Sequence, residues 1–379
     1  MNNSKVQWLA SLLIVCILVS CTQVAAQIIS SNLNNTATGF VYTHWTLKYP
    51  SNEKISLNQF WVPLSGYVAI QENIEVRYYL AGSSNNLELG KTQGERYLGG
   101  VGDARIELSR TFAKDRVMVS GGINLPFGKT ELGINDDRAI IDMLSQNFLE
   151  FPMRSFGQGL GLRLTVGAAN NISENTVLGV GVGFEYIGPY NPYLGIGEYN
   201  PGDVISADLG IRNRSKTTAY SFSMNYSLYM DDKLEKSKVF KQGQQFGMRA
   251  RGIYDDDRYR VSGGAAYLFR GRNSRYDLQA SNIIDRLKLY GNELVFSFEF
   301  GRYLPGGWRF SPLFSLLLIA GNEENLGESR VFTSGGSINK IFSKRYRASF
   351  WFKFMTGDAD GKTIELSGYQ LSTSLSAAI

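Results

Sequence analysis

Residues 347–354 read Arg-Ala-Ser-Phe-Trp-Phe-Lys-Phe, and this stretch decides the fold. Because successive side chains of a β-strand point to opposite faces, Phe350 and Phe352 share one face, and Arg347 and Lys353 share the other. The segment is therefore apolar on one side and polar on the other. A strand of this kind fits a sheet that has lipid on one face and water on the other.

Segments of about ten residues with the same alternation recur from about Gly66 to the C-terminus. In one of them, Leu294 and Phe296 oppose Glu293 and Glu299. The repeated pattern predicts an all-β fold, a transmembrane antiparallel up-and-down β-barrel in the bacterial outer membrane. The expected partners are outer-membrane lipid, the barrel-assembly machinery and a small-molecule solute.

Two kinds of connection separate these segments. Tight polar turns are expected near 72–73, 113–115, 172–174, 213–215, 255–257, 304–307 and 343–345. Longer loops are expected near 82–98, 126–157, 188–202, 231–243, 271–286, 321–329 and 357–363. In outer-membrane barrels the short turns face the periplasm and the long loops face outside, which predicts about 16 strands with both ends periplasmic. The alternative has about 14 wall strands and a first hairpin that enters the lumen.

The N-terminus has the features of an export signal, namely Lys5 followed by an apolar run too short to span a membrane comfortably. One interpretation is a signal peptide, 1–26, cleaved after small residues and followed by a single barrel domain, 27–379. The alternative is a lipoprotein signal, 1–20, which would leave Cys21 as a lipidated N-terminus. Both interpretations direct the chain out of the cytoplasm.

Composition argues against several other functions. The net charge is +5, but basic and acidic residues are interspersed without a lysine-arginine run, so nucleic-acid binding has little support. Cleavage after Ala26 would remove both cysteines, Cys16 and Cys21, and His44 is the only histidine. The chain has no nucleophile-elbow motif, no strand-to-helix glycine fingerprint and no complete calcium loop. We therefore expect a protein that is not an enzyme and that uses no cofactor or metal.

The predicted strand faces collect charged residues on the lumen side, because a charge on the lipid face near the midplane costs about 2–4 kcal/mol. These charges either brace and hydrate the wall or select solutes. The lumen candidates are Glu75, Arg77, Arg105, Glu107, Arg163, Glu185, Arg249, Arg251, Glu293, Glu299, Arg347 and Lys353.

One segment, about 134–156, breaks the strand rhythm. Acidic residues follow Asn135 as in the first turn of a helix, and Pro152 is a natural stop. Between them, apolar residues recur at helical spacing, and such a stripe must be covered by protein, by the barrel mouth or by a ligand. The helix either packs on extracellular loops or forms a gate that contacts solute. The solute-contact candidates here are Ile140, Leu144, Phe148, Phe151 and Phe156.

The loop at 188–203 holds three prolines and three tyrosines, Tyr190, Tyr193 and Tyr199. Prolines stiffen a loop, and tyrosine rings have an apolar body with a polar tip. These rings are further solute-contact candidates, and the alternative is that they pack the loops together.

Four motifs carry a family resemblance. GVGD at 100–103 opens a strand, and NLPFGK at 124–129 closes the next one. FGQG at 156–159 comes at the end of the helical insertion, and YNPGD at 199–203 ends the tyrosine-containing loop. With them, residues 99–210 resemble the outer-membrane barrel family named for the MetA pathway of phenol degradation, which is similar to transporters of the FadL type. The remainder of the chain is similar only in its barrel pattern.

The resemblance implies passive uptake of a hydrophobic or aromatic small molecule. Two other functions fit the residues themselves. A porin for small polar solutes fits the charged lumen, and a structural or secretion-associated barrel without transport needs only the fold.

Overall fold

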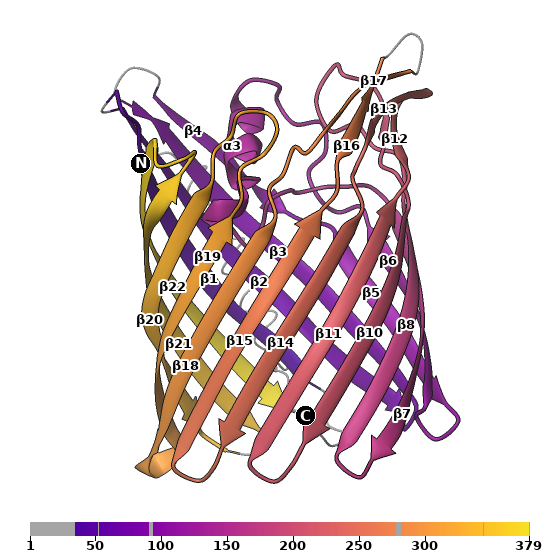
Figure 1. Ribbon diagram of the computed structural model, residues 1–379, viewed down its shortest axis with the longest axis vertical. Coiled ribbons are helices and arrows are strands. Elements are labelled where there is room, and N and C mark those ends of the chain that lie inside the picture. Colours follow the sequence, from indigo (N-terminus) through magenta and orange to yellow (C-terminus); the bar gives the residue numbers. More distant parts are fainter. Residues whose placement is uncertain (1–34, 52, 91–93, 278–281, 344, 379) are drawn as a thin grey trace, which may run out of the picture.

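The chain forms a closed antiparallel barrel of tilted strands, seen in this computed structural model, with tight turns at one end and long loops at the other (Figure 1). The structure describes residues 35–51, 53–90, 94–277, 282–343 and 345–378. Both predicted cleavage sites, and Cys21, lie outside the described residues. None of the described helices is long and apolar enough to cross a membrane.

The described strands of the wall follow one another around the barrel in chain order. They are β1 (Asn35–Lys48), β2 (Lys54–Gln71), β3 (Ile74–Leu89), β4 (Glu95–Val101), β5 (Ala104–Phe112), β6 (Val117–Leu125), β7 (Gly161–Ser173), β8 (Thr176–Ile187), β10 (Val204–Arg214), β11 (Thr218–Tyr229), β14 (Gln245–Asp255), β15 (Tyr259–Arg270), β18 (Glu293–Leu304), β19 (Trp308–Ile319), β20 (Ser329–Ile341), β21 (Tyr346–Ala359) and β22 (Ile364–Ala378).

The wall has 16 strand positions, as the main prediction expected. β4 and β5 pair with successive parts of β3 and together occupy one position. β1 pairs with β2 on one side and with β22 on the other, and this pairing closes the barrel. The alternative with 14 wall strands is therefore wrong, because the first hairpin belongs to the wall.

The outer face carries the apolar side chains that the alternation predicted. Phe296 and Phe298 of β18, for example, are 46% and 48% exposed. The ladder between β20 and β21 sets Gly335 opposite Lys353 and Phe350 opposite Ile338, so the charged row of residues 347–354 faces the lumen. An apolar belt that surrounds a polar interior makes this a multi-pass barrel of the bacterial outer membrane.

The seven predicted tight turns all lie at the end of the barrel opposite the long loops. The predicted long loop at 82–98 is wrong, because β3 continues to Leu89 and β4 starts at Glu95. Its polar run resembles a loop, but 82–89 and 95–98 belong to strands of the wall. The connection predicted at 357–363 is present but shorter, since β21 continues to Ala359 and β22 starts at Ile364.

The other long loops contain structure that the sequence did not predict. They form a five-stranded sheet of β9 (Tyr199–Asn200), β12 (Asp231–Leu234), β13 (Ser237–Lys241), β16 (Asn273–Tyr276) and β17 (Ile283–Leu287). The predicted helical insertion contains α3 (Asp136–Leu144) and the 3-10 turn η1 (Asn147–Leu149). A further turn, η2 (Pro305–Gly307), joins β18 to β19.

The register predicts a strong asymmetry between neighbouring residues of β7. Val166 is 41% exposed on the outer face, and Thr165 faces the lumen near the middle of the strand. Val166→Arg should lower the free energy of unfolding by about 2–4 kcal/mol, since it puts a charge into hydrocarbon. Thr165→Arg should cost much less. Denaturant titration of both variants refolded in lipid vesicles measures the difference, and equal losses would show that the faces are misassigned.

The topology is tested by single cysteines in a chain that lacks Cys16 and Cys21. Leu194 is 59% exposed in a long loop, and Asp257 is exposed in a tight turn. An impermeant maleimide added to intact cells should label Leu194→Cys and leave Asp257→Cys unlabelled until the outer membrane is opened. The reverse result would invert the barrel.

Candidate functional site

The insertion between β6 and β7 leaves the wall where β4 and β5 meet. Gly102 and Asp103 interrupt the strand there, and the inward side changes from even-numbered residues in β4 to odd-numbered residues in β5. The Asp103 carboxylate accepts hydrogen bonds from the backbone N–H of Gly128 at 2.8 Å and of Gln158 at 2.7 Å. It also accepts one from the side-chain amide of Asn124 at 3.1 Å. Three of the motifs that carry the family resemblance therefore meet at one carboxylate.

Helix α3 starts where the acidic residues predicted it. The Asp137 carboxylate accepts a hydrogen bond from the backbone N–H of Gly133 at 2.9 Å and pairs with Lys129 at 3.0 Å. A negative charge in the first turn is favourable because the helix N-terminus carries partial positive charge. Ile140 and Leu144 lie on one face and are fully buried.

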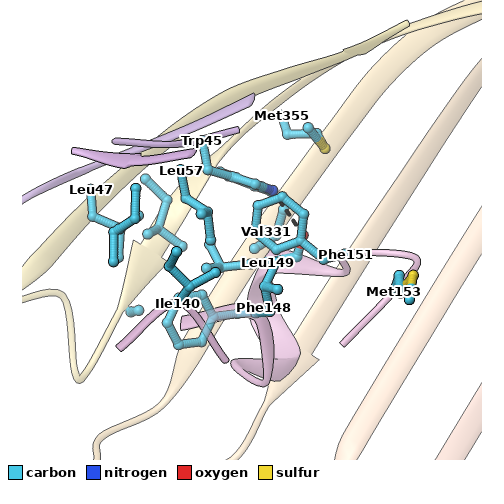
Figure 2. Packing of buried hydrophobic residues seen from close by; sticks show 14 of the residues in the cluster. Trp45, Leu47, Leu57, Ile140, Phe148, Leu149, Phe151, Met153, Val331 and Met355 are labelled. Atoms are coloured by element: carbon cyan, nitrogen blue, oxygen red, sulfur yellow. Dashed lines mark hydrogen bonds between the residues drawn. The ribbon is translucent and has the colours of Figure 1, made fainter. Parts of the chain in front are cut away.

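The apolar stripe of the insertion packs against the inner wall of the barrel (Figure 2). We call the buried residues that meet there the mouth cluster. From the insertion they are Leu132, Ile140, Leu144, Phe148, Leu149, Phe151, Met153 and Phe156. From the wall they are Trp45, Leu47, Leu57, Leu87, Leu98, Leu317, Ile319, Val331, Met355, Ala359 and Leu366. The lumen wall near the loop end therefore provides most of the cover for the helix, and Tyr193 of the 188–203 loop also packs against the cluster.

Two wall side chains also fix the backbone of the insertion. Trp45 donates its indole N–H to the carbonyl of Leu149 at 2.8 Å, the dashed line in Figure 2. The Gln59 amide donates to the carbonyl of Met153 at 2.7 Å and accepts from its N–H at 3.1 Å, as a neighbouring strand would. Gln59 also donates to the Asn85 side chain at 2.8 Å, and both residues are fully buried.

All five insertion residues proposed to contact solute lie in the mouth cluster, with at most 5% of their surface exposed. In this structure they contact the protein itself. The sequence reasoning missed their partners, Trp45 and Gln59. The available signal was apolar Trp45 and Leu47 on the inward face of β1, where a wet lumen calls for polar residues.

The three tyrosines of the second candidate loop pack against other structure at the loop end of the barrel. Tyr190 and Tyr199 meet edge to face with ring centroids 6.0 Å apart, and burial raises the pKa of Tyr190 to about 12. Burial and a hydrogen bond to Asp232 raise the pKa of Tyr199. Tyr193 lies under the guanidinium of Arg138, 6.0 Å from its ring centroid, and thus joins the loop to α3.

The 12 predicted lumen charges all lie on inward-facing rows of the ladder. Several form ion pairs along the wall: Arg77 with Glu75 and Glu107, Arg163 with Glu185, and Glu293 with Arg270. Others have no carboxylate within 4.0 Å among the described residues, namely Arg105, Arg249, Arg251, Arg347 and Lys353. The inner wall therefore carries basic groups in excess of its acidic partners.

Glu150 lies where the mouth cluster meets this charged wall. Its backbone is left-handed, with φ of 48°. Burial raises the pKa of its carboxyl, and the nearby charges of Lys353 and Arg154 oppose that shift. The insertion therefore has an apolar side and an edge directed at basic groups of the lumen.

His44 lies outside this site. It is on the outer face of β1, with one ring nitrogen 2.6 Å from the Asn58 side chain and the ring 5.1 Å from that of Tyr369. Within the described ranges, no three His, Cys, Asp or Glu side chains gather as a metal site would require.

No family model matches the sequence. No curated protein matches it either. Among solved structures, OprB of Pseudomonas putida at high pH is 8% identical, with a TM-score of 0.50 over 92% of this chain and 94% of that one. OprD of Pseudomonas aeruginosa is 8% identical, with a TM-score of 0.43 over 91% and 94%. The CymD monoaromatic hydrocarbon channel is 12% identical, with a TM-score of 0.41 over 91% and 88%. At these identities the likeness to OprB shows the barrel fold alone.

The contacts of Gln59 predict that it holds the insertion in place. Gln59→Met keeps the length of the side chain but leaves the N–H and the carbonyl of Met153 without partners, at about 1–3 kcal/mol for each buried group. We expect trypsin to cut after Arg138 or Arg154 faster than in the unmodified protein, while the barrel stays heat-modifiable. Gln370→Met is the control, since Gln370 also lies on the inner wall but bonds to Thr43. Equal protection of the two variants would contradict the anchoring role.

Proposed function

We propose that this protein is a passive outer-membrane channel for small molecules and that hydrophobic or aromatic molecules are its preferred solutes. The observation that carries the proposal is the mouth cluster. It sets apolar side chains of the insertion against apolar side chains of the wall inside the lumen, near the loop end. A lumen that served polar solutes alone would have no need of this layer.

An interface between two apolar surfaces opens at different cost for different solutes. Exposing apolar surface to water costs about 25 cal/mol per Å². A hydrophobic solute that enters between α3 and the wall replaces protein contacts with its own and exposes little apolar surface. A sugar cannot do so, because its hydroxyls would lose their hydrogen bonds to water in an apolar layer. The mouth cluster therefore favours apolar solutes over sugars.

The insertion is held by polar contacts as well as by the mouth cluster. Asp103, Trp45 and Gln59 bind it by hydrogen bonds, and Arg96 of β4 forms an ion pair with Asp136 at 3.3 Å. The 188–203 loop adds backbone hydrogen bonds at Glu131 and Leu132. Ile140, Leu144, Phe148, Phe151 and Phe156 would meet the solute when this packing opens. Tyr190, Tyr193 and Tyr199 would line the approach from outside.

A second function, a porin for small polar solutes, is favoured by the basic groups of the inner wall that lack acidic partners. In that case the insertion would narrow the lumen, and solutes would pass beside it. The resemblance of residues 99–210 to the MetA and FadL-type families supports the first proposal, that the solute is hydrophobic. The third candidate, a structural or secretion-associated barrel, would be favoured if no solute passes through the protein.

The functional test loosens the mouth cluster. Leu144→Ser with Phe148→Ser removes apolar side chains that are 0% and 5% exposed. Proteoliposomes of the unmodified protein should swell slowly in arabinose, and those of the double variant several-fold faster, because the apolar layer no longer excludes sugar. Cells that lack their own porins should take up labelled toluene through the unmodified protein, and the double variant should lose its preference for toluene over arabinose.

The matched control is Phe127→Ser with Leu194→Ser, since these side chains are 61% and 59% exposed and lie outside the cluster. The control should behave as the unmodified protein does. Fast swelling in arabinose without toluene uptake by the unmodified protein would favour the porin. Neither activity would favour the structural role.

A further inference from the structure

Three arginines that are far apart along the chain lie on the same side of the inner wall, at the tight-turn end of the barrel. Arg260 lies near the start of β15, Arg309 near the start of β19 and Arg347 near the start of β21. All three are on inward-facing rows. The ladder sets Arg309 opposite Asn339 of β20, and Asn339 opposite Ser349, which lies two residues from Arg347 on the same face of β21. The Arg309 side chain crosses over Gly301, where a Cβ would lie 3.2 Å from its Cδ.

The acidic residues nearby do not balance these charges. Asp255 is already engaged, since it binds Arg260 at 2.5 Å and accepts the Tyr303 hydroxyl at 2.8 Å. Glu299 lies 3.9 Å from Arg309, beyond hydrogen-bond reach. Arg347 has no carboxylate within 4.0 Å among the described residues. Because guanidinium groups stay protonated, these three arginines and two carboxylates together carry three positive charges and two negative ones.

The wall beside the three arginines is polar but neutral. Ser349 donates to the Asn339 side chain at 2.7 Å, and the Asn339 amide donates to Ser337 at 3.0 Å. These three side chains are at least nine-tenths buried, so they use their donors and acceptors on one another. Because these side chains are neutral and bond to one another, they do not compensate the excess positive charge. An anion that enters the lumen can do so.

We propose that Arg347 and Arg309, supported by Arg260, form a binding site for a small oxyanion on the inner wall near the periplasmic exit. A planar guanidinium donates two parallel N–H groups to the two oxygens of a carboxylate or to a phosphate. Arg347 has its donors free of acidic partners, and Arg309 is held only loosely by Glu299. The oxyanion is either the carboxylate of a passing organic solute or inorganic phosphate, which share this chemistry.

The site rests on the proposed channel function in one respect, since a solute reaches it through the lumen. Together the two sites would suit an organic acid with an apolar body, which the mouth cluster admits and the arginines retain. The charge also has an effect on its own, because an excess of one sign on a low-dielectric wall raises the local concentration of the opposite ion.

Binding to the full-length protein, refolded in detergent, tests the site without requiring transport. Isothermal titration at low ionic strength with sodium benzoate, and separately with sodium phosphate, should show saturable binding of at least one of them. Arg347→Gln should weaken that binding about tenfold or more, because it removes a charge-assisted contact. The control is Arg302→Gln, which removes the same charge from the exposed outer side of β18 and should bind as the unmodified protein does.

The anion that binds distinguishes the two sources: benzoate alone indicates an organic acid, and phosphate alone indicates the inorganic ion. If neither anion binds the unmodified protein, or if Arg347→Gln and Arg302→Gln bind equally well, the proposal is wrong. Heat-modifiable migration reports whether each variant is folded. Should Arg347→Gln fail to fold, Arg309→Gln and Arg347→Lys are judged by the same criterion. Saturable binding without toluene or arabinose uptake would keep this site and reject the channel.

Discussion

The backbone hydrogen bond is the constraint on which this structure depends. Lipid offers no partner for an N–H or a carbonyl, so the sheet must close on itself, and the pairing of β1 with β22 closes it. The ladder is interrupted at β4. Its edge that faces away from β3 has no wall strand as a partner among the described residues, because the next wall strand, β6, pairs with β5. There Asp103 binds the N–H groups of Gly128 and Gln158, and the insertion takes the place that a strand would occupy.

Closure of the wall also explains why the lumen contains an apolar layer, the mouth cluster, in addition to the apolar belt on the outer face. Wall closure directs half of every strand inward, where water can enter, and a helix with an apolar stripe is unstable in such a place unless it is covered. The chain meets this need by making the inner face of the wall apolar at the same height, with Trp45, Leu57 and Val331. The polar groups within the layer are satisfied by specific bonds, as Gln59 does for Met153.

The sequence predicted what depends on local periodicity. Alternation along 347–354 and its repeats predicted the strands, their faces and the tight turns, because the period of a strand is set by its own backbone. The stripe of α3 was predicted for the same reason. The polar run within 82–98 misled, since Asn85 is polar yet buried against Gln59 and belongs to β3. The apolar inward face of β1 was readable from the sequence, but its pairing with the insertion was not, because Trp45 and Leu149 are brought together only by the folded barrel.

The two candidate sites would hold a solute by different forces, and they lie at opposite ends of the lumen. The mouth cluster is apolar and near the loop end, so binding there depends on area removed from water and is little affected by salt. The arginines lie near the tight turns in a wet lumen, so attraction to them is screened within about 10 Å at 0.1 M salt. On the proposed function, a solute that enters from outside would first give up water from its apolar surface. It would meet the guanidinium groups only after passing the mouth cluster.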